Sequence, residues 1–318
     1  MKTPILIVLG LLALTATAPA TGIKSFKVTP EWEQKIQQIA PRIAPVKPKA
    51  ERKVLVFSLT TGYKHWCIPH TSAMVKILGE KSGAYTTILS NNIEQFLPLN
   101  ISQYDAIVLN NNCPDRKNRD VFLDALVNKV DKYGAKYKDL SLEERNAFAL
   151  KLYNSLTTYI ANGGGLIVLH GGITNFNNSG EFSEIVGGSF NFHPKQQQVT
   201  LNIVDETHAL TKPFGGEPFV HIDEPYLFNG AYTKLNFRPL LEIDVAKLHP
   251  DKRAKDIAEI PRYVSWIKRH EQGRVFFCSP SHNAQSFEQP VLLEFILGGI
   301  QYTLGDLDCP DAPPAHQH

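Results

Sequence analysis

Residues 163–172, GGGLIVLHGG, carry the clearest fold signal in this 318-residue sequence. The run of three glycines predicts the end of a helix, and residues 166–169 are apolar without alternation. Such a run is typical of a strand in a parallel sheet that is covered on both faces. The strand is followed by His170, Gly171 and Gly172, which predicts a polar loop at its carboxyl end.

Two other stretches resemble this strand. Residues 54–59 and 105–110 also contain continuous apolar runs, so we expect the three to be neighbours in one mainly parallel sheet. Helical patterns lie between them at residues 69–81 and 141–161. This alternation predicts right-handed βαβ units and an α/β fold. Further strands are predicted at residues 85–89, 198–204, 221–228, 239–245, 263–268 and 274–279, and further helices at 118–130 and 290–302.

The N-terminus has the pattern of a secretory signal. Lys2 precedes an apolar stretch at residues 5–13, and small residues follow up to Ala20. The apolar stretch is shorter than the about 20 residues that a membrane span needs. We therefore expect cleavage near Ala20 and a periplasmic or secreted protein with no membrane attachment after cleavage. A retained N-terminal anchor is the alternative.

The remaining chain divides into three predicted parts. Residues 21–51 form a proline-rich leader around a short amphipathic stretch at 32–40, residues 52–305 form one domain, and residues 306–318 form a loose tail. The two tail histidines, His316 and His318, are expected at the surface. A net charge of +2 with both signs interspersed gives no nucleic-acid footprint. The expected partner is a small molecule.

The four cysteines are too few and too widely spaced for a disulfide scaffold or a zinc ribbon. They are Cys67, Cys113, Cys278 and Cys309. In an oxidising compartment a disulfide between Cys67 and Cys113 is one expectation, because each follows a predicted strand. Free buried thiols are the other.

Histidines recur after predicted strands. Those in question are His65, His170, His193, His208 and His282. Ligands of open parallel sheets bind at the carboxyl ends of the strands, and neutral imidazole is both a common metal ligand and a suitable general base. No HxxxH spacing occurs, so a divalent metal such as zinc would need ligands from distant segments. The candidate metal ligands are His65, His170 and His193.

Five motifs together resemble the ThuA-like (trehalose utilization) family over roughly residues 52–305. They are GYKH at 62–65, GGGLIVLH at 163–170, GGSFNFHP at 187–194, DEPY at 223–226, and GRVF at 273–276 followed by Ser281-His282. Family members more often have Gly-His where this chain has Ser281-His282. The family is similar in fold to the class I glutamine amidotransferases. The resemblance therefore implies a flavodoxin-like, mainly parallel sheet with helices on both faces.

The resemblance also implies chemistry. At the elbow where the amidotransferases have a nucleophilic cysteine, this chain has His170, so we do not expect a glutaminase. ThuA-like proteins are implicated in processing 3-keto-disaccharides. A ketone acidifies the neighbouring C–H bond, so a histidine base and an electrophile would suffice for isomerisation or elimination. We also expect the backbone N–H groups of Gly171 and Gly172 to face the developing oxyanion.

We therefore expect an exported isomerase, lyase or hydrolase that acts on a carbohydrate by enolisation or metal-assisted hydrolysis. The expected catalytic residues are His170, His65, His193 and Glu224. The expected substrate-binding residues are Tyr63, Trp66, Asp223, Tyr226 and His282. A non-catalytic carbohydrate-binding domain is the alternative, and a purely structural domain is a third. The adjacent carboxylates of Asp223 and Glu224 favour the enzyme, because binding alone has little need of them.

Overall fold

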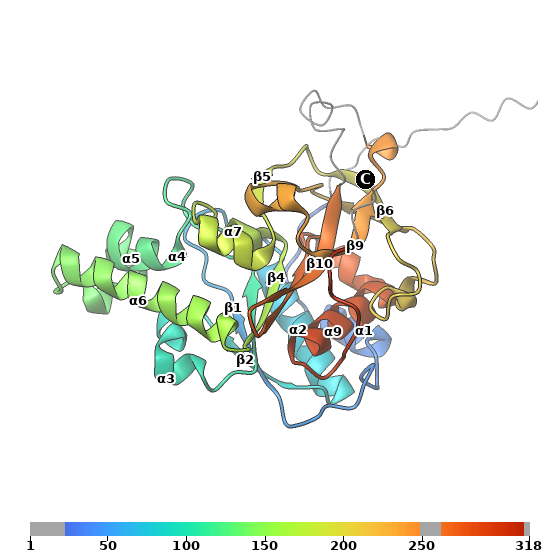
Figure 1. Ribbon diagram of the computed structural model, residues 1–318, viewed down its shortest axis with the longest axis horizontal. Coiled ribbons are helices and arrows are strands. Elements are labelled where there is room, and N and C mark those ends of the chain that lie inside the picture. Colours follow the sequence, from blue (N-terminus) through green and yellow to red (C-terminus); the bar gives the residue numbers. More distant parts are fainter. Residues whose placement is uncertain (1–22, 249–261, 315–318) are drawn as a thin grey trace, which may run out of the picture.

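The computed structural model describes residues 23–248 and 262–314 (Figure 1). The predicted signal peptide and the two tail histidines lie outside the described residues. Among those described, no helix is both long and apolar enough to cross a membrane.

Nine strands of the described chain form one sheet. They are β1 (Lys53–Phe57), β2 (Thr86–Ser90), β3 (Ala106–Asn110), β4 (Gly165–Leu169), β6 (Gln197–Ile203), β7 (Phe219–Asp223), β9 (Arg238–Ile243), β10 (Tyr263–His270) and β11 (Gly273–Cys278). Their order across the sheet is β2-β1-β3-β4-β11-β10-β9-β6-β7. The prediction that residues 54–59, 105–110 and 166–169 are neighbours is confirmed.

The sheet has a parallel and an antiparallel half. Strands β2, β1, β3, β4 and β11 pair in parallel, with Leu55 opposite Ile107 and Ile107 opposite Leu166. All three side chains are fully buried, as expected for strands covered on both faces. From β11 the sheet continues antiparallel through β10, β9, β6 and β7.

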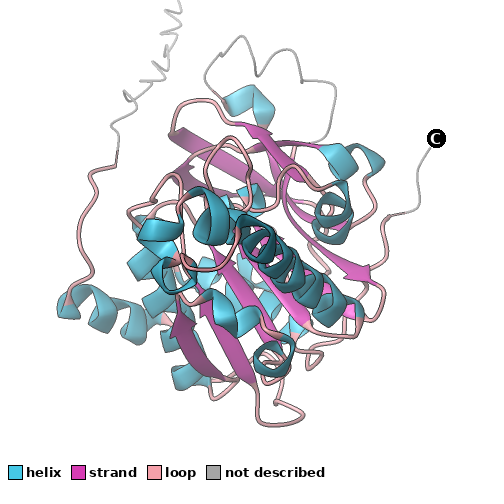
Figure 2. Cartoon of the chain, turned by 90° about the vertical axis from the view of Figure 1, so that its left-hand side faces the viewer, coloured by secondary structure: helices cyan, strands magenta, loops and turns pink. Residues whose placement is uncertain are grey.

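Helices cover both faces of the parallel half. The helices are α1 (Pro30–Ile39), α2 (Ile68–Ser82), α3 (Pro98–Ile101), α4 (Val121–Leu123), α5 (Val130–Tyr133), α6 (Leu142–Ala161), α7 (Gly180–Val186) and α9 (Pro290–Thr303). Figure 1 shows α1, α2 and α9 on one side of the sheet and α6 and α7 on the other, and Figure 2 shows the strands between the helices. The longest helix, α6, begins at a capping box of Ser141 and Glu144, as predicted.

Two predicted elements are divided in the structure. Residues 118–130 are not one helix, because a wider π-helical turn (Asp124–Asn128) separates α4 from α5. Residues 221–228 are not one strand, because Pro225 interrupts them. The second part, β8 (Leu227–Asn229), pairs with a strand that the sequence did not indicate, β5 (Ser189–Phe192). This small sheet places residues 190–193 beside the loop that follows β7.

Both ends of the described chain pack against the domain or bond to it. Trp32 and Ile36 of α1 are buried in the core. The side chain of Gln301 in α9 bonds both the N–H and the C=O of Val46. Beyond α9, the buried Asp306 forms an ion pair with Arg52. Residues just after 305 are therefore held by polar contacts, whereas the sequence suggested a loose tail.

Candidate functional site

Four predicted site residues meet at the carboxyl end of the parallel half. His65 follows β1, His170 follows β4, His282 follows β11 and Glu224 follows β7. One ligand atom from each lies within 4.8 Å of the corresponding atom of every other. We call these four residues the His–Glu cluster. Four separate loops supply its four members, so the fold and not a local motif assembles the site.

His170 occupies a strained elbow after β4. Its φ is +41°, a left-handed conformation that costs a residue other than glycine about 1–3 kcal/mol. Its Nδ1 lies 2.9 Å from the carbonyl oxygen of Ser279, which can only accept, so Nδ1 carries the proton. The unprotonated Nε2 then faces Glu224 Oε2 at 3.4 Å.

The expectation for the N–H of Gly171 is wrong. It donates to Asn111 Oδ1 at 3.1 Å, so it is not available to an oxyanion. The His170 ring is fully buried and packs on Tyr226 with 3.9 Å between ring centroids.

His65 and His282 complete the imidazole set. The His65 ring centroid lies 5.2 Å from that of His170 and 5.1 Å from that of His282. His282 is buried, yet neither of its ring nitrogens forms a hydrogen bond within the described structure. Its Nε2 lies 3.6 Å from Glu224 Oε1. A buried polar atom without a partner costs about 1–3 kcal/mol, so these nitrogens call for a ligand.

The three imidazoles are uncharged at neutral pH. Burial, together with neighbouring imidazoles, lowers the pKa of His170 and of His282 to about 3. Burial and the other two imidazoles of the cluster place the pKa of His65 well below its ordinary value. Each ring therefore offers a nitrogen lone pair.

Asp223, an expected substrate-binding residue, lies behind the cluster. It is 2% exposed, and its Oδ1 accepts the backbone N–H of Glu224 at 2.7 Å. Its Oδ2 lies 3.4 Å from Nδ1 of His221, a buried residue that the sequence did not single out. Burial raises the pKa of Asp223 well above its ordinary value. Asp223 thus orients Glu224 through a hydrogen bond to the backbone of Glu224.

A cavity of about 480 Å³ opens onto the cluster, within the usual range for small-molecule sites. Its lining includes the expected residues Tyr63, His65, His193, Glu224 and Tyr226. It also includes residues that the sequence did not indicate, namely Cys113, Pro114, Arg116, Arg119, Thr174, Phe190, Asn191 and Phe192. The cavity therefore reaches the cluster through His65 and Glu224.

His193 lies on the wall of this cavity. Its side chain is 33% exposed, and its Nε2 is 3.6 Å from Glu224 Oε2. Nδ1 donates to the carbonyl oxygen of Pro194 at 2.9 Å, which leaves Nε2 unprotonated in the neutral ring. The ring stacks on Tyr226 at an interplanar angle of 22°. His193 is thus an accessible base held in one orientation.

Two other highlighted residues lie elsewhere. The described lining of the cavity does not include Trp66, whose ring packs on Phe26 and His70 at centroid distances of 5.4 and 5.1 Å. His208 uses Nε2 to bond the carbonyl oxygen of Pro310. Both stabilise the packing of chain segments near the termini.

All four cysteines are free thiols, so the structure has the second of the two cysteine alternatives. Cys113 lines the cavity, and its Sγ lies 3.6 Å from His65 Nδ1. Burial raises the pKa of Cys113 to about 11, so it is a protonated thiol at neutral pH and a poor nucleophile.

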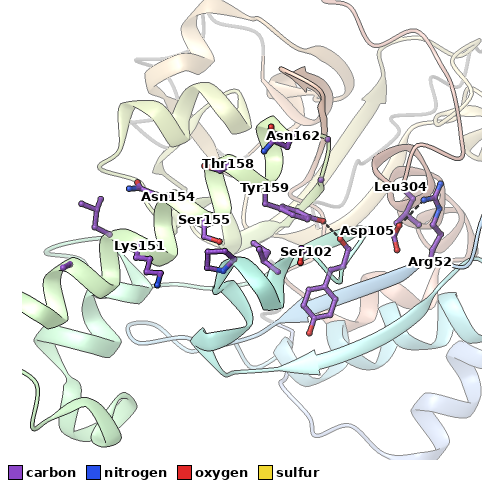
Figure 3. A pocket seen from close by; sticks show the side chains of 17 residues that line it. Arg52, Ser102, Asp105, Lys151, Asn154, Ser155, Thr158, Tyr159, Asn162 and Leu304 are labelled. Carbon is purple, nitrogen blue, oxygen red and sulfur yellow. Dashed lines mark hydrogen bonds and ion pairs between the residues drawn. The ribbon is translucent and has the colours of Figure 1, made fainter.

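A larger cavity of about 860 Å³ lies at the amino ends of β3 and β4, beside α6 (Figure 3). Several of its polar groups already have partners, since Arg52 pairs with Asp105 and the Tyr159 hydroxyl donates to the carbonyl oxygen of Tyr104. No histidine or cysteine is among its described lining residues. The smaller cavity, at the carboxyl ends of the strands, is therefore the better candidate site.

Comparisons with known proteins identify the family and the fold. A family model described as trehalose utilisation (ThuA) matches residues 142–303. A ThuA-like protein from Bacteroides uniformis has a similar fold, with a TM-score of 0.55 and 14% identity over 81% of this chain and 93% of that one. A ThuA-like protein from Parabacteroides merdae also has a similar fold, with a TM-score of 0.52 and 19% identity over 80% of this chain and 90% of that one. No curated protein matches by sequence. The chain belongs to the ThuA (trehalose utilisation) family.

Proposed function

We propose that this chain is an exported enzyme that processes a keto-sugar, such as a 3-keto-disaccharide, by enolisation. The observation that carries the proposal is the position of His193. Its accessible imidazole, whose Nδ1 donates to the Pro194 carbonyl, lies in the cavity with Nε2 3.6 Å from Glu224 Oε2, beside the histidines of the His–Glu cluster. Export is supported by the signal-like N-terminal sequence, and the carbohydrate substrate by the family description.

The proposed reaction begins with proton transfer to His193. The C–H bond next to the ketone breaks, its proton moves to Nε2, and the electron pair forms a C=C bond as the carbonyl π electrons move to oxygen. In elimination the enolate then expels the glycosidic oxygen, which takes the proton from His193. In isomerisation the hydroxyl proton of the enediolate moves to the former carbonyl oxygen, and His193 returns its proton to the former carbonyl carbon, so that the ketone and the hydroxyl group exchange places. A positioned acid–base group of this kind contributes about 10²–10⁴-fold to the rate.

The cavity wall suits a sugar. Tyr63 and Phe190 offer aromatic surface, and Asn191 and Arg119 offer hydrogen-bond donors. Aromatic surface with a few polar groups is the usual composition of a small-molecule site.

The test is a comparison of oxidised and unoxidised disaccharides with the purified full chain. We expect turnover of a 3-keto-disaccharide and no turnover of the matching unoxidised sugar. Saturable binding of either sugar without any turnover would instead identify a carbohydrate-binding domain and overturn the proposal.

Tyr63 and Trp66 provide a matched pair of aromatic variants. Tyr63→Ala removes a cavity wall and is expected to raise KM for the keto-sugar about 10-fold, whereas Trp66→Ala is expected to leave KM within about 2-fold. Trp66→Ala should instead lower the free energy of unfolding, by about 1–3 kcal/mol, because Trp66 packs on Phe26 and His70. Steady-state kinetics and denaturant unfolding measure the two effects. A larger KM effect for Trp66→Ala than for Tyr63→Ala would contradict this placement.

A further inference from the structure

The geometry points to a divalent transition-metal site formed by His65, His170, His282 and Glu224. The catalytic meaning of this site rests on the proposed function, but the binding of the ion does not. His193, a metal candidate from the sequence, is replaced by His282, whose ligand atom belongs to the compact group.

The spacing of the ligand atoms fits a small ion. Four ligands at about 2.0–2.1 Å from a tetrahedral zinc ion lie about 3.3 Å from one another. His170 Nε2 lies 3.4 Å from Glu224 Oε2, and His282 Nε2 lies 3.6 Å from Glu224 Oε1. All four ligand atoms lie within 4.8 Å of one another, so some pairs would have to close by up to about 1.5 Å around a bound ion.

The hydrogen bond of His170 favours a cation between His170 and Glu224. Because Nδ1 of His170 donates to the Ser279 carbonyl, Nε2 presents its lone pair to the Glu224 oxygen at 3.4 Å. A metal ion would turn this contact between two acceptors into two favourable ones. It would also give one of the two ring nitrogens of His282, neither of which is hydrogen-bonded in the described part of the chain, a partner.

Residues around the cluster orient its members, as is usual for metal ligands. The Ser279 carbonyl fixes the tautomer of His170, and Asp223 holds the backbone of Glu224. Three imidazoles and one carboxylate favour zinc or a similar ion over calcium and magnesium, which prefer oxygen ligands. To polarise the carbonyl group of a substrate in the cavity, the ion would have to accept a fifth ligand beside these four.

Because Gly171 packs closely against His65, replacing this glycine tests the metal site. A Cβ at Gly171 would lie 2.7 Å from His65 Cε1 and 2.8 Å from Cys113 Sγ, so Gly171→Ala must displace His65. We expect a loss of zinc affinity of about 10–100-fold. Gly180→Ala is the control, because a Cβ there meets nothing within 4 Å. Equal zinc affinity of the two variants, by calorimetric titration, would count against the site.

The decisive experiment strips the folded full chain with a chelator and titrates it with zinc. We expect one equivalent to bind, a rise in melting temperature, and loss of both effects in His282→Asn and Glu224→Gln. Absence of stoichiometric uptake by the folded chain, or unchanged uptake in both variants, would overturn the inference. Zinc binding without keto-sugar turnover would refute the proposed function alone, and full turnover by the zinc-free chain would refute the catalytic role of the ion.

Discussion

Replacing His170 with asparagine is expected to abolish zinc uptake at micromolar metal and to lower keto-sugar turnover at least 10²-fold. The imidazole supplies one of four ligands, and loss of even an outer-shell partner costs about 10–100-fold in metal affinity. Asparagine is chosen because it tolerates the left-handed conformation that residue 170 adopts, with φ of +41°. Metal analysis after gel filtration and steady-state kinetics measure both effects.

His170→Ala separates chemistry from folding. Alanine adopts the left-handed conformation at a cost of about 1–2 kcal/mol, so this variant should melt earlier than His170→Asn while losing zinc equally. A variant that melts earlier but binds zinc and turns over normally would mean that His170 is only a structural residue.

His193→Gln is expected to lower turnover by about 10²–10⁴-fold while the zinc content stays at one equivalent. The variant removes the accessible base but none of the four cluster ligands. Kinetics and metal analysis on the same preparation test this separation. Loss of zinc in His193→Gln would place His193 in the metal site, and normal turnover would remove it from the mechanism.

The sequence predicted the parallel half of the sheet because its strands are local apolar runs. The ends of β1 and β4 were therefore predictable, and His65 and His170 with them. Strands of the antiparallel half were also predicted, but their order across the sheet was not, because a local pattern does not show which strands pair. The pairing of β5 with β8, which places His193 near Glu224, depends on such contacts and left no local pattern.

The errors in the predicted site, which concern Asp223 and the two cavity arginines, have local causes. Asp223 is the last residue of β7 and shares a face with His221, whereas Glu224 lies in the loop that follows and belongs to the cluster. Adjacency in sequence suggested one role for both carboxylates. Arg116 and Arg119 were missed because the loop after β3 contains no histidine and no recognisable motif.

The most direct test of enolisation is turnover of a 3-keto-disaccharide that carries deuterium at the carbon next to the ketone, compared with the unlabelled sugar and followed by mass spectrometry and NMR. Enolisation breaks this C–D bond, so the account predicts slower turnover of the labelled sugar and a product in which the deuterium has left that carbon, both dependent on His193. Product formed at the unlabelled rate with all deuterium still at that carbon would contradict the mechanism, because the bond would then not have been broken.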